Sequence, residues 1–128
     1  MSQKNIIQTD QAPLPVGPYS QAVRAGDFLF CSGQIAIDPR VNEMITGDVK
    51  AQALRVLENC QAVLQAAGAD FSNVVKTTIF LNDINNFVHV NEVYSSYFKK
   101  DFPARATIQA QRLPKDANIE ISMEAKIF

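Results

Sequence analysis

The 128-residue sequence contains one histidine, two cysteines and no tryptophan. Cys31 and Cys60 form no Cys-x-x-Cys pair, and His89 alone cannot complete a four-ligand zinc site with them. A Ser-His-Asp arrangement is also missing. His89 is the only histidine, and it lies one or two positions away from the apolar stripe of a predicted helix, as a solvated residue does. No phosphate loop or dinucleotide fingerprint occurs among the five glycines. These absences predict a site that uses no metal and no cofactor, and two free thiols that pack in the core.

Long hydrophobic runs and clustered charge are absent as well. No apolar run approaches the roughly 20 residues that span a bilayer. Residues 1–5 lack the apolar stretch of a signal peptide, so we expect a cytoplasmic protein. Twelve basic and thirteen acidic residues give a formal charge of −1, and the longest basic run is Lys99-Lys100. Nucleic acid is therefore a poor match as a partner, because it requires a concentrated positive surface.

The sequence has the composition of one soluble globular domain, with 47% hydrophobic and 20% charged residues. No repeat or linker divides residues 1–128, which we take as a single domain. Segments 21–25 and 28–32 predict two strands joined by a hairpin turn at Gly26-Asp27. A long helix follows, with Asp48 as its N-cap and Gly68 at its left-handed C-terminal cap. Its apolar residues recur at helical spacing: Val49, Ala53, Val56, Leu57, Cys60, Val63, Leu64 and Ala67.

The second half of the chain predicts three more strands and one helix. Segment 74–81 is β-branched, with one face expected to carry Val75, Thr77, Ile79 and Leu81, and the other Val74 and Phe80. Asn85 or Asn86 is expected to cap a helix that cannot continue through Pro103 and whose apolar stripe is Phe87, Val90, Tyr94, Tyr97 and Phe98.

The closing segments 105–111 and 119–127 alternate apolar and polar residues, as half-buried strands do. Their apolar positions are Ala106, Ile108 and Ala110, then Ile119, Ile121, Met123, Ala125 and Ile127. The order ββαβαββ predicts an α+β fold with one mixed sheet and two helices on one face. The uncovered face would combine apolar side chains with the polar residues of the closing strands, which predicts a closed homo-oligomer.

Several polar residues occupy positions that suit a binding site. Arg105 opens a predicted strand just after a proline, and its planar guanidinium can bind a carboxylate through two hydrogen bonds. Glu120 lies on the polar face of the last strand. Gly33 follows Ser32 at the end of a buried strand, where a glycine lets a ligand reach a backbone N–H. Tyr19 lies in a proline-rich arm and could close over a pocket. Each of these residues, taken alone, is more typical of an ordinary surface position.

Seven motifs follow one another along the chain: GPYSQA at 17–22, SGQI at 32–35, VKTTIFL at 75–81, VNEVY at 90–94, FPAR at 102–105, RLPKD at 112–116 and IEI at 119–121. Together they resemble the RidA-type reactive intermediate deaminases, a family also labelled endoribonuclease L-PSP. The resemblance implies a chorismate-mutase-like fold assembled as a homotrimer, with clefts between neighbouring subunits. It also implies hydrolysis of 2-imino acids such as 2-iminobutanoate and 2-iminopropanoate, or of their enamine tautomers, to 2-keto acids and ammonia.

The resemblance further implies a role for each matching residue. Arg105 would hold the substrate carboxylate, and Glu120 would orient or activate the attacking water without any cofactor. Thr107 stands where family members often carry a cysteine, so a main-chain contact would survive there but a thiol role would not. The pocket would be shaped in addition by Tyr19, Ser32, the Gly33 N–H and Asn91.

Strand geometry adds a prediction about where the two catalytic candidates meet. If segments 105–111 and 119–127 pair as a hairpin, matching their apolar faces leaves Arg105 about 13–20 Å from Glu120. A small imino acid spans far less, so either the two residues meet across a subunit boundary or these strands are not hairpin neighbours, and we predict the former. Two other functions stay open: a regulatory trimer that binds a small carboxylate, and an endoribonuclease or translation inhibitor, which the charge of −1 disfavours.

Overall fold

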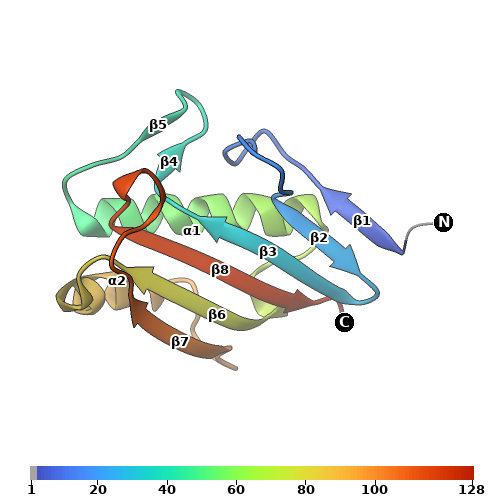
Figure 1. The fold of residues 1–128 in the computed structure, drawn as a ribbon. Helices are drawn as coiled ribbons and strands as arrows, with labels where there is room; N and C mark the ends of the chain where they lie inside the picture. Colours follow the sequence, from blue (N-terminus) through green and yellow to red (C-terminus); the bar gives the residue numbers. More distant parts are fainter. Residues whose placement is uncertain (1–2) are drawn as a thin grey trace.

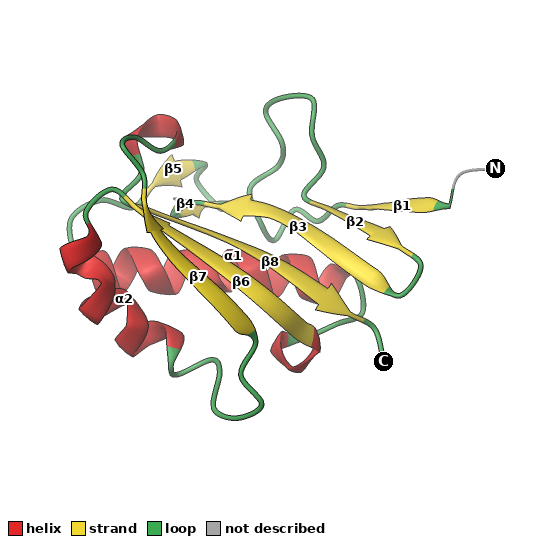
Figure 2. Ribbon diagram, turned by 60° about the horizontal axis from the view of Figure 1, so that its bottom comes forward, coloured by secondary structure: helices red, strands yellow, loops and turns green. Residues whose placement is uncertain are grey.

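In the computed structural model, which describes residues 3–128, two helices pack on one face of a six-stranded sheet (Figures 1 and 2). The strands lie in the order β1-β2-β3-β8-β6-β7, and only β6 and β7 run parallel. A two-stranded hairpin lies beside the sheet. The elements are β1 (Lys4–Ile7), β2 (Ala22–Ala25), β3 (Phe28–Gln34), β4 (Ile37–Asp38), β5 (Glu43–Met44), α1 (Val49–Ala66), β6 (Val74–Leu81), α2 (Phe87–Tyr94), β7 (Ala104–Gln109) and β8 (Ile119–Lys126). The predicted α+β fold is confirmed, with β1 as an additional edge strand.

The long helix α1 begins and ends where the capping residues predicted. The Asp48 side chain accepts a hydrogen bond from the Lys50 N–H at 3.1 Å. Gly68 follows the last turn with a φ of +77°, which glycine adopts without a steric penalty. The buried side of the helix packs on the sheet residues Leu29, Ile79 and Ile121 and consists largely of Ala53, Val56, Leu57, Cys60, Val63 and Leu64.

The pairing of the closing strands differs from the predicted hairpin. β8 lies between β3 and β6, and β7 pairs in parallel with β6 at the edge of the sheet. Ile108 is aligned with Phe80, and both lie on the face opposite the helices. The expectation that the apolar side of segment 105–111 shares a face with Ile121 is therefore wrong. Alternation shows which side chains share a face, but it does not show which face the helices cover.

Two further expectations need correction. A register shift between Val74 and Lys76 makes Val74 5% exposed and Val75 39% exposed, the reverse of the predicted assignment. The helix α2 ends at Tyr94, so the last two residues of its predicted stripe, Tyr97 and Phe98, lie beyond it. They still join the core, because the Phe71 ring contacts both at centroid distances of 5.0 and 5.2 Å.

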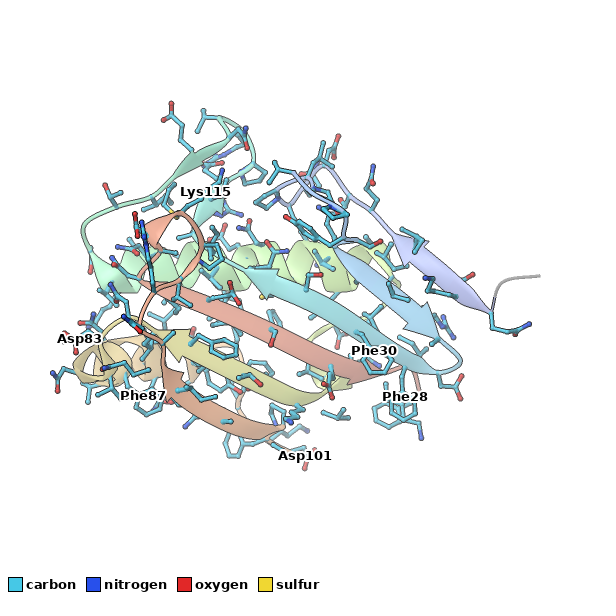
Figure 3. The ribbon with its side chains drawn as sticks, in the orientation of Figure 1. Phe28, Phe30, Asp83, Phe87, Asp101 and Lys115 are labelled. Carbon is cyan, nitrogen blue, oxygen red and sulfur yellow. The ribbon has the colours of Figure 1, made fainter. Side chains whose placement is uncertain are left out.

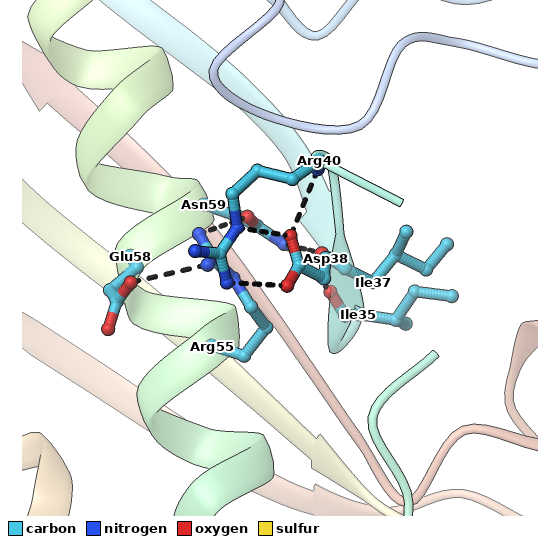
Figure 4. A network of polar contacts seen from close by, with 7 residues as sticks. All are labelled: Ile35, Ile37, Asp38, Arg40, Arg55, Glu58 and Asn59. Carbon is cyan, nitrogen blue, oxygen red and sulfur yellow. Dashed lines mark hydrogen bonds and ion pairs between the residues drawn. The ribbon is translucent and has the colours of Figure 1, made fainter. Parts of the chain in front are cut away.

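A polar network attaches the β4–β5 hairpin to α1 (Figure 4). The buried Asn59 side chain donates to the carbonyl oxygens of Ile35 and Ile37 at 3.2 and 2.9 Å. At the start of the hairpin the Arg40 guanidinium binds the Asp38 carboxylate and lowers its pKa to about 2. This network fixes the segment that follows β3, which forms one wall of a cavity described below.

The sheet face opposite the helices carries exposed apolar side chains. Phe28 and Phe30 on β3 lie on this face near one end of the sheet (Figure 3), and each ring is about half exposed. Ile108 on β7 is 45% exposed. An exposed surface that mixes apolar and polar side chains in this way is typical of an interface between protein chains. No helix among residues 3–128 is long and apolar enough to cross a membrane.

Candidate active site on two faces of the sheet

Arg105 is held in place by residues of α2. Its Nη1 donates to the Asn91 Oδ1 at 2.8 Å, and its Cζ lies 5.0 Å from the ring centroids of both Phe87 and Tyr94. Such ring contacts stabilise a guanidinium and restrict its orientation. The side chain stays exposed to solvent. An exposed guanidinium held in one orientation is suited to binding a carboxylate.

The guanidinium opens onto a cavity of about 430 Å³ beside α2. The aromatic rings of Tyr94, Phe98 and Phe102 form much of its wall, and Arg105 supplies its charge. Burial raises the pKa of the Tyr94 hydroxyl, which pairs with the Thr77 Oγ1 at 2.9 Å. This cavity is lined by Asn91, Tyr94, Ser95, Phe98, Phe102, Pro103 and Arg105.

Glu120 lies in a second cavity of about 450 Å³ on the other side of the sheet. The cavity also contains Tyr19, Ser32 and Gly33, three of the residues predicted to shape a pocket. Partial burial raises the pKa of the Glu120 carboxyl, because desolvation disfavours the charged form. A carboxylate with raised proton affinity is suited to accept a proton from water.

Arg105 and Glu120 point to opposite faces of the same sheet. Arg105 is aligned with Thr77 on β6 and Glu120 with Phe80 on the same strand. Positions three apart in a regular strand project to opposite sides, and Thr77 lies on the side of the helices. The two closing strands are not hairpin neighbours, so the separation predicted from a hairpin offset does not apply. The strand β6 lies between them, and the two side chains project from opposite faces of the sheet.

Gly33 makes room for the Glu120 carboxylate. A Cβ atom at Gly33 would lie 2.6 Å from the Glu120 Oε2 and 2.7 Å from its Cδ, distances that real contacts do not reach. The pairing of β3 with β8 shifts register between Cys31 and Gln34, which brings this backbone close to Glu120. Gly33 has no positive φ, so close approach is the reason for glycine here.

The other predicted site residues fall into different environments. The Ser32 Oγ donates to the Ser20 carbonyl oxygen at 2.6 Å, so the hydroxyl can only accept a bond from a ligand. The Tyr19 ring is about half exposed at the edge of the Glu120 cavity. Thr107 lies on β7 beside Ile79, outside the linings of both described cavities. Burial raises the pKa of Cys31 to about 12, which leaves that thiol unreactive.

Sequence reasoning missed the aromatic support of Arg105 and the apolar wall beside Glu120. Phe87 and Tyr94 were interpreted only as core positions of a helix, and both contact the guanidinium. Leu14 and Val16 line the Glu120 cavity from the proline-rich arm, although each is more than half exposed. The sequence did contain a sign of this wall, because Leu14 and Val16 alternate with prolines in a segment predicted to be a loop, and loops often carry binding residues.

We expect Gly33→Ala to destabilise the protein by about 1–3 kcal/mol, because the new methyl group overlaps the Glu120 carboxylate. In a Glu120→Ala background the overlapping atoms are gone, and the cost should fall to less than half. Urea unfolding of the four proteins at one concentration measures the coupling. An equal cost in both backgrounds would show that the backbone, and not Glu120, requires glycine.

Comparison with known proteins places the chain among relatives that match nearly its whole length. The endoribonuclease L-PSP family model matches residues 9–127. The human 2-iminobutanoate/2-iminopropanoate deaminase is 48% identical over 122 residues, which cover 95% of this chain and 89% of that protein.

Two solved structures share the fold. A Rid family protein of unknown function from Yersinia pestis superimposes with a TM-score of 0.95 at 44% identity and covers 97% of this chain and 99% of that one. The E. coli protein TdcF, solved with bound serine, superimposes with a TM-score of 0.92 at 40% identity and the same coverage. The two-helix α+β fold, the motif order and these matches agree, and the chain belongs to the Rid family of proteins described by the endoribonuclease L-PSP model.

Proposed function

We propose that this protein hydrolyses 2-imino acids and their enamine tautomers to 2-keto acids and ammonia, in sites shared by neighbouring subunits of a homotrimer. The observation that carries the proposal is that Arg105 and Glu120 of one chain lie on opposite faces of its sheet. Each lines its own open cavity, and in the proposed trimer a second copy would complete it. The name of the human relative supports the reaction. The serine bound to the E. coli relative supports a site for a small amino or imino acid.

The proposed chemistry needs only positioning and one base. The Arg105 guanidinium binds the substrate carboxylate, while Glu120 accepts a proton from a water molecule as its oxygen attacks the C=N carbon. The resulting carbinolamine takes that proton on its nitrogen, and the C–N bond breaks as the hydroxyl oxygen forms the C=O group and passes its own proton through Glu120 to the departing ammonia. An iminium and one water thus yield the keto acid and one ammonium ion. Acid–base assistance of this kind contributes about 10²–10⁴-fold, and fixed orientation adds to it.

The remaining site residues shape the pocket. Asn91 fixes the guanidinium through its 2.8 Å bond. Across the subunit boundary, Tyr19 would cover the substrate, Ser32 would accept a hydrogen bond from the imine nitrogen, and the Gly33 N–H would contact the ligand. Thr107 would contribute through its main chain. The exposed apolar residues of the open sheet face, Phe28, Phe30 and Ile108 among them, would be buried between the three copies.

The reaction is tested by generating an imino acid with an amino-acid oxidase and trapping it with semicarbazide. We expect the protein to lower the yield of semicarbazone, and Arg105→Ala to lose at least about 10²-fold in kcat/KM, because a charged hydrogen-bonding partner of the carboxylate is removed. Arg24→Ala is the matched control, since that partly exposed arginine lies on β2, outside both cavities, and contacts Gly26 and Asp27 beside it in the chain. A yield equal to that of buffer would refute the proposal.

A further inference from the structure

The buried side chain of Gln21 attaches the proline-rich arm between β1 and β2 to the sheet. Gln21 is 1% exposed, and its Nε2 donates to the carbonyl oxygens of Thr9, Pro13 and Ala12 at 2.9, 2.8 and 3.3 Å. Its Oε1 accepts from the Thr9 N–H at 2.7 Å. An amide side chain has two donor hydrogens and an acceptor oxygen, so every polar group of Gln21 is used to hold the arm.

A second attachment lies at the other end of the arm. The Ser32 Oγ and N–H bind the carbonyl oxygens of Ser20 and Gln21 at 2.6 and 2.9 Å. The segment between the two attachments rises on the side of the sheet that also carries the β4–β5 hairpin (Figures 1 and 2). Its residues Pro13, Leu14, Val16 and Tyr19 form the wall of the cavity that contains Glu120.

We infer that Gln21 is a positioning residue that holds this arm as a substrate-covering wall over the Glu120 cavity. The inference rests on the proposed function and adds a residue that borders the cavity but whose side-chain polar groups all bond to the arm. Leu14 and Val16 remain largely exposed, so little apolar burial holds this part of the arm in place. Beyond the buried Ala12, its position depends on the bonds of Gln21 and Ser32, because segments with few buried contacts open readily. The wall it presents is apolar, which suits contact with the aliphatic part of a substrate.

Gln21→Glu tests this role with almost no change in shape. The carboxylate replaces the donating Nε2 by an oxygen that the three carbonyl groups repel, while the Thr9 N–H keeps an acceptor. We expect amide hydrogen exchange within residues 9–20 to accelerate about tenfold or more while α1 and β8 stay protected. KM should rise about tenfold with kcat within about threefold of the unmodified value, because Arg105 and Glu120 are unchanged.

Gln11→Glu is the matched control, because Gln11 lies in the same arm and its side chain is exposed. It should leave exchange and KM unchanged. If Gln21→Glu does not fold, Gln21→Met removes the same donors without adding charge and should give the same two effects. Unchanged exchange in the arm, or faster exchange with an unchanged KM, would overturn the inference. Inactivity of the unmodified protein would refute the proposed function, and binding of 2-ketobutanoate would then replace KM as the readout for Gln21.

Discussion

Glu120→Gln is expected to lower kcat by about 10²–10⁴-fold while binding of 2-ketobutanoate, measured by calorimetry, stays within a few-fold of the unmodified protein. Glutamine keeps the shape of the side chain but cannot accept a proton from water. Loss of binding together with activity would instead assign Glu120 to ligand recognition. Retained activity would favour a base elsewhere in the site. A protein that binds the keto acid but never hydrolyses imines would match the regulatory alternative.

The same substitution is expected to stabilise the protein at neutral pH. Burial raises the Glu120 pKa above its ordinary value of 4.5, so the folded state binds a proton more tightly than the unfolded state does. The ionised carboxylate therefore costs stability above that raised pKa, and the cost disappears as the pH falls below 4.5. The thermal midpoint of Glu120→Gln should exceed that of the unmodified protein at pH 7 and match it at low pH.

Ionisation of Glu120 should also control activity, but it should raise kcat where it lowers stability. Glu120 must be ionised to act as a base, so kcat is expected to fall as the pH drops through its raised pKa. In Glu120→Gln this acidic limb should be absent from the residual rate. If kcat falls at the same acidic pH in both proteins, a group other than Glu120 controls the pH dependence of kcat. Gain of stability with loss of activity is the combination expected when a site holds a partly desolvated charge for catalysis.

Mixing two inactive variants is expected to restore activity. Co-expressed Arg105→Ala and Glu120→Gln chains, each with its own tag, should form mixed oligomers in which some sites combine an intact arginine with an intact glutamate. If chains assort independently, about one quarter of the sites are intact, so about one quarter of the activity returns. The physical reason is that these residues face opposite sides of one sheet, so the proposed shared site takes them from two different copies.

The matched control co-expresses two differently tagged copies of Arg105→Ala, which contain no intact arginine and should stay inactive. Purification through both tags establishes that the chains assemble together. Mixed oligomers without activity would show that the two residues do not serve a common site, and would contradict the shared-site proposal. Every trimer that carries both tags contains one intact site of its three, so the expected activity rises from about one quarter in the unselected mixture to about one third after this purification.

Several local elements of this protein could be predicted from its sequence alone. Asp48 and Gly68 mark the ends of α1 because capping and left-handed geometry depend on residues next to each other in the chain. The turn at Gly26 and the alternation of β8 follow from equally local rules. The motifs from residue 17 to residue 121 were also sufficient to identify the family.

Only the tertiary structure decided which strands are neighbours and which faces are covered. Alternation in 105–111 is compatible with either face, and the parallel pairing of β7 with β6 turns Ile108 away from the helices and Arg105 toward α2. The steric reason for Gly33 and the buried bonds of Gln21 depend on partners far away in sequence. Short-range preferences are set by adjacent residues, whereas pairing and burial are set by long-range contacts that no local pattern encodes.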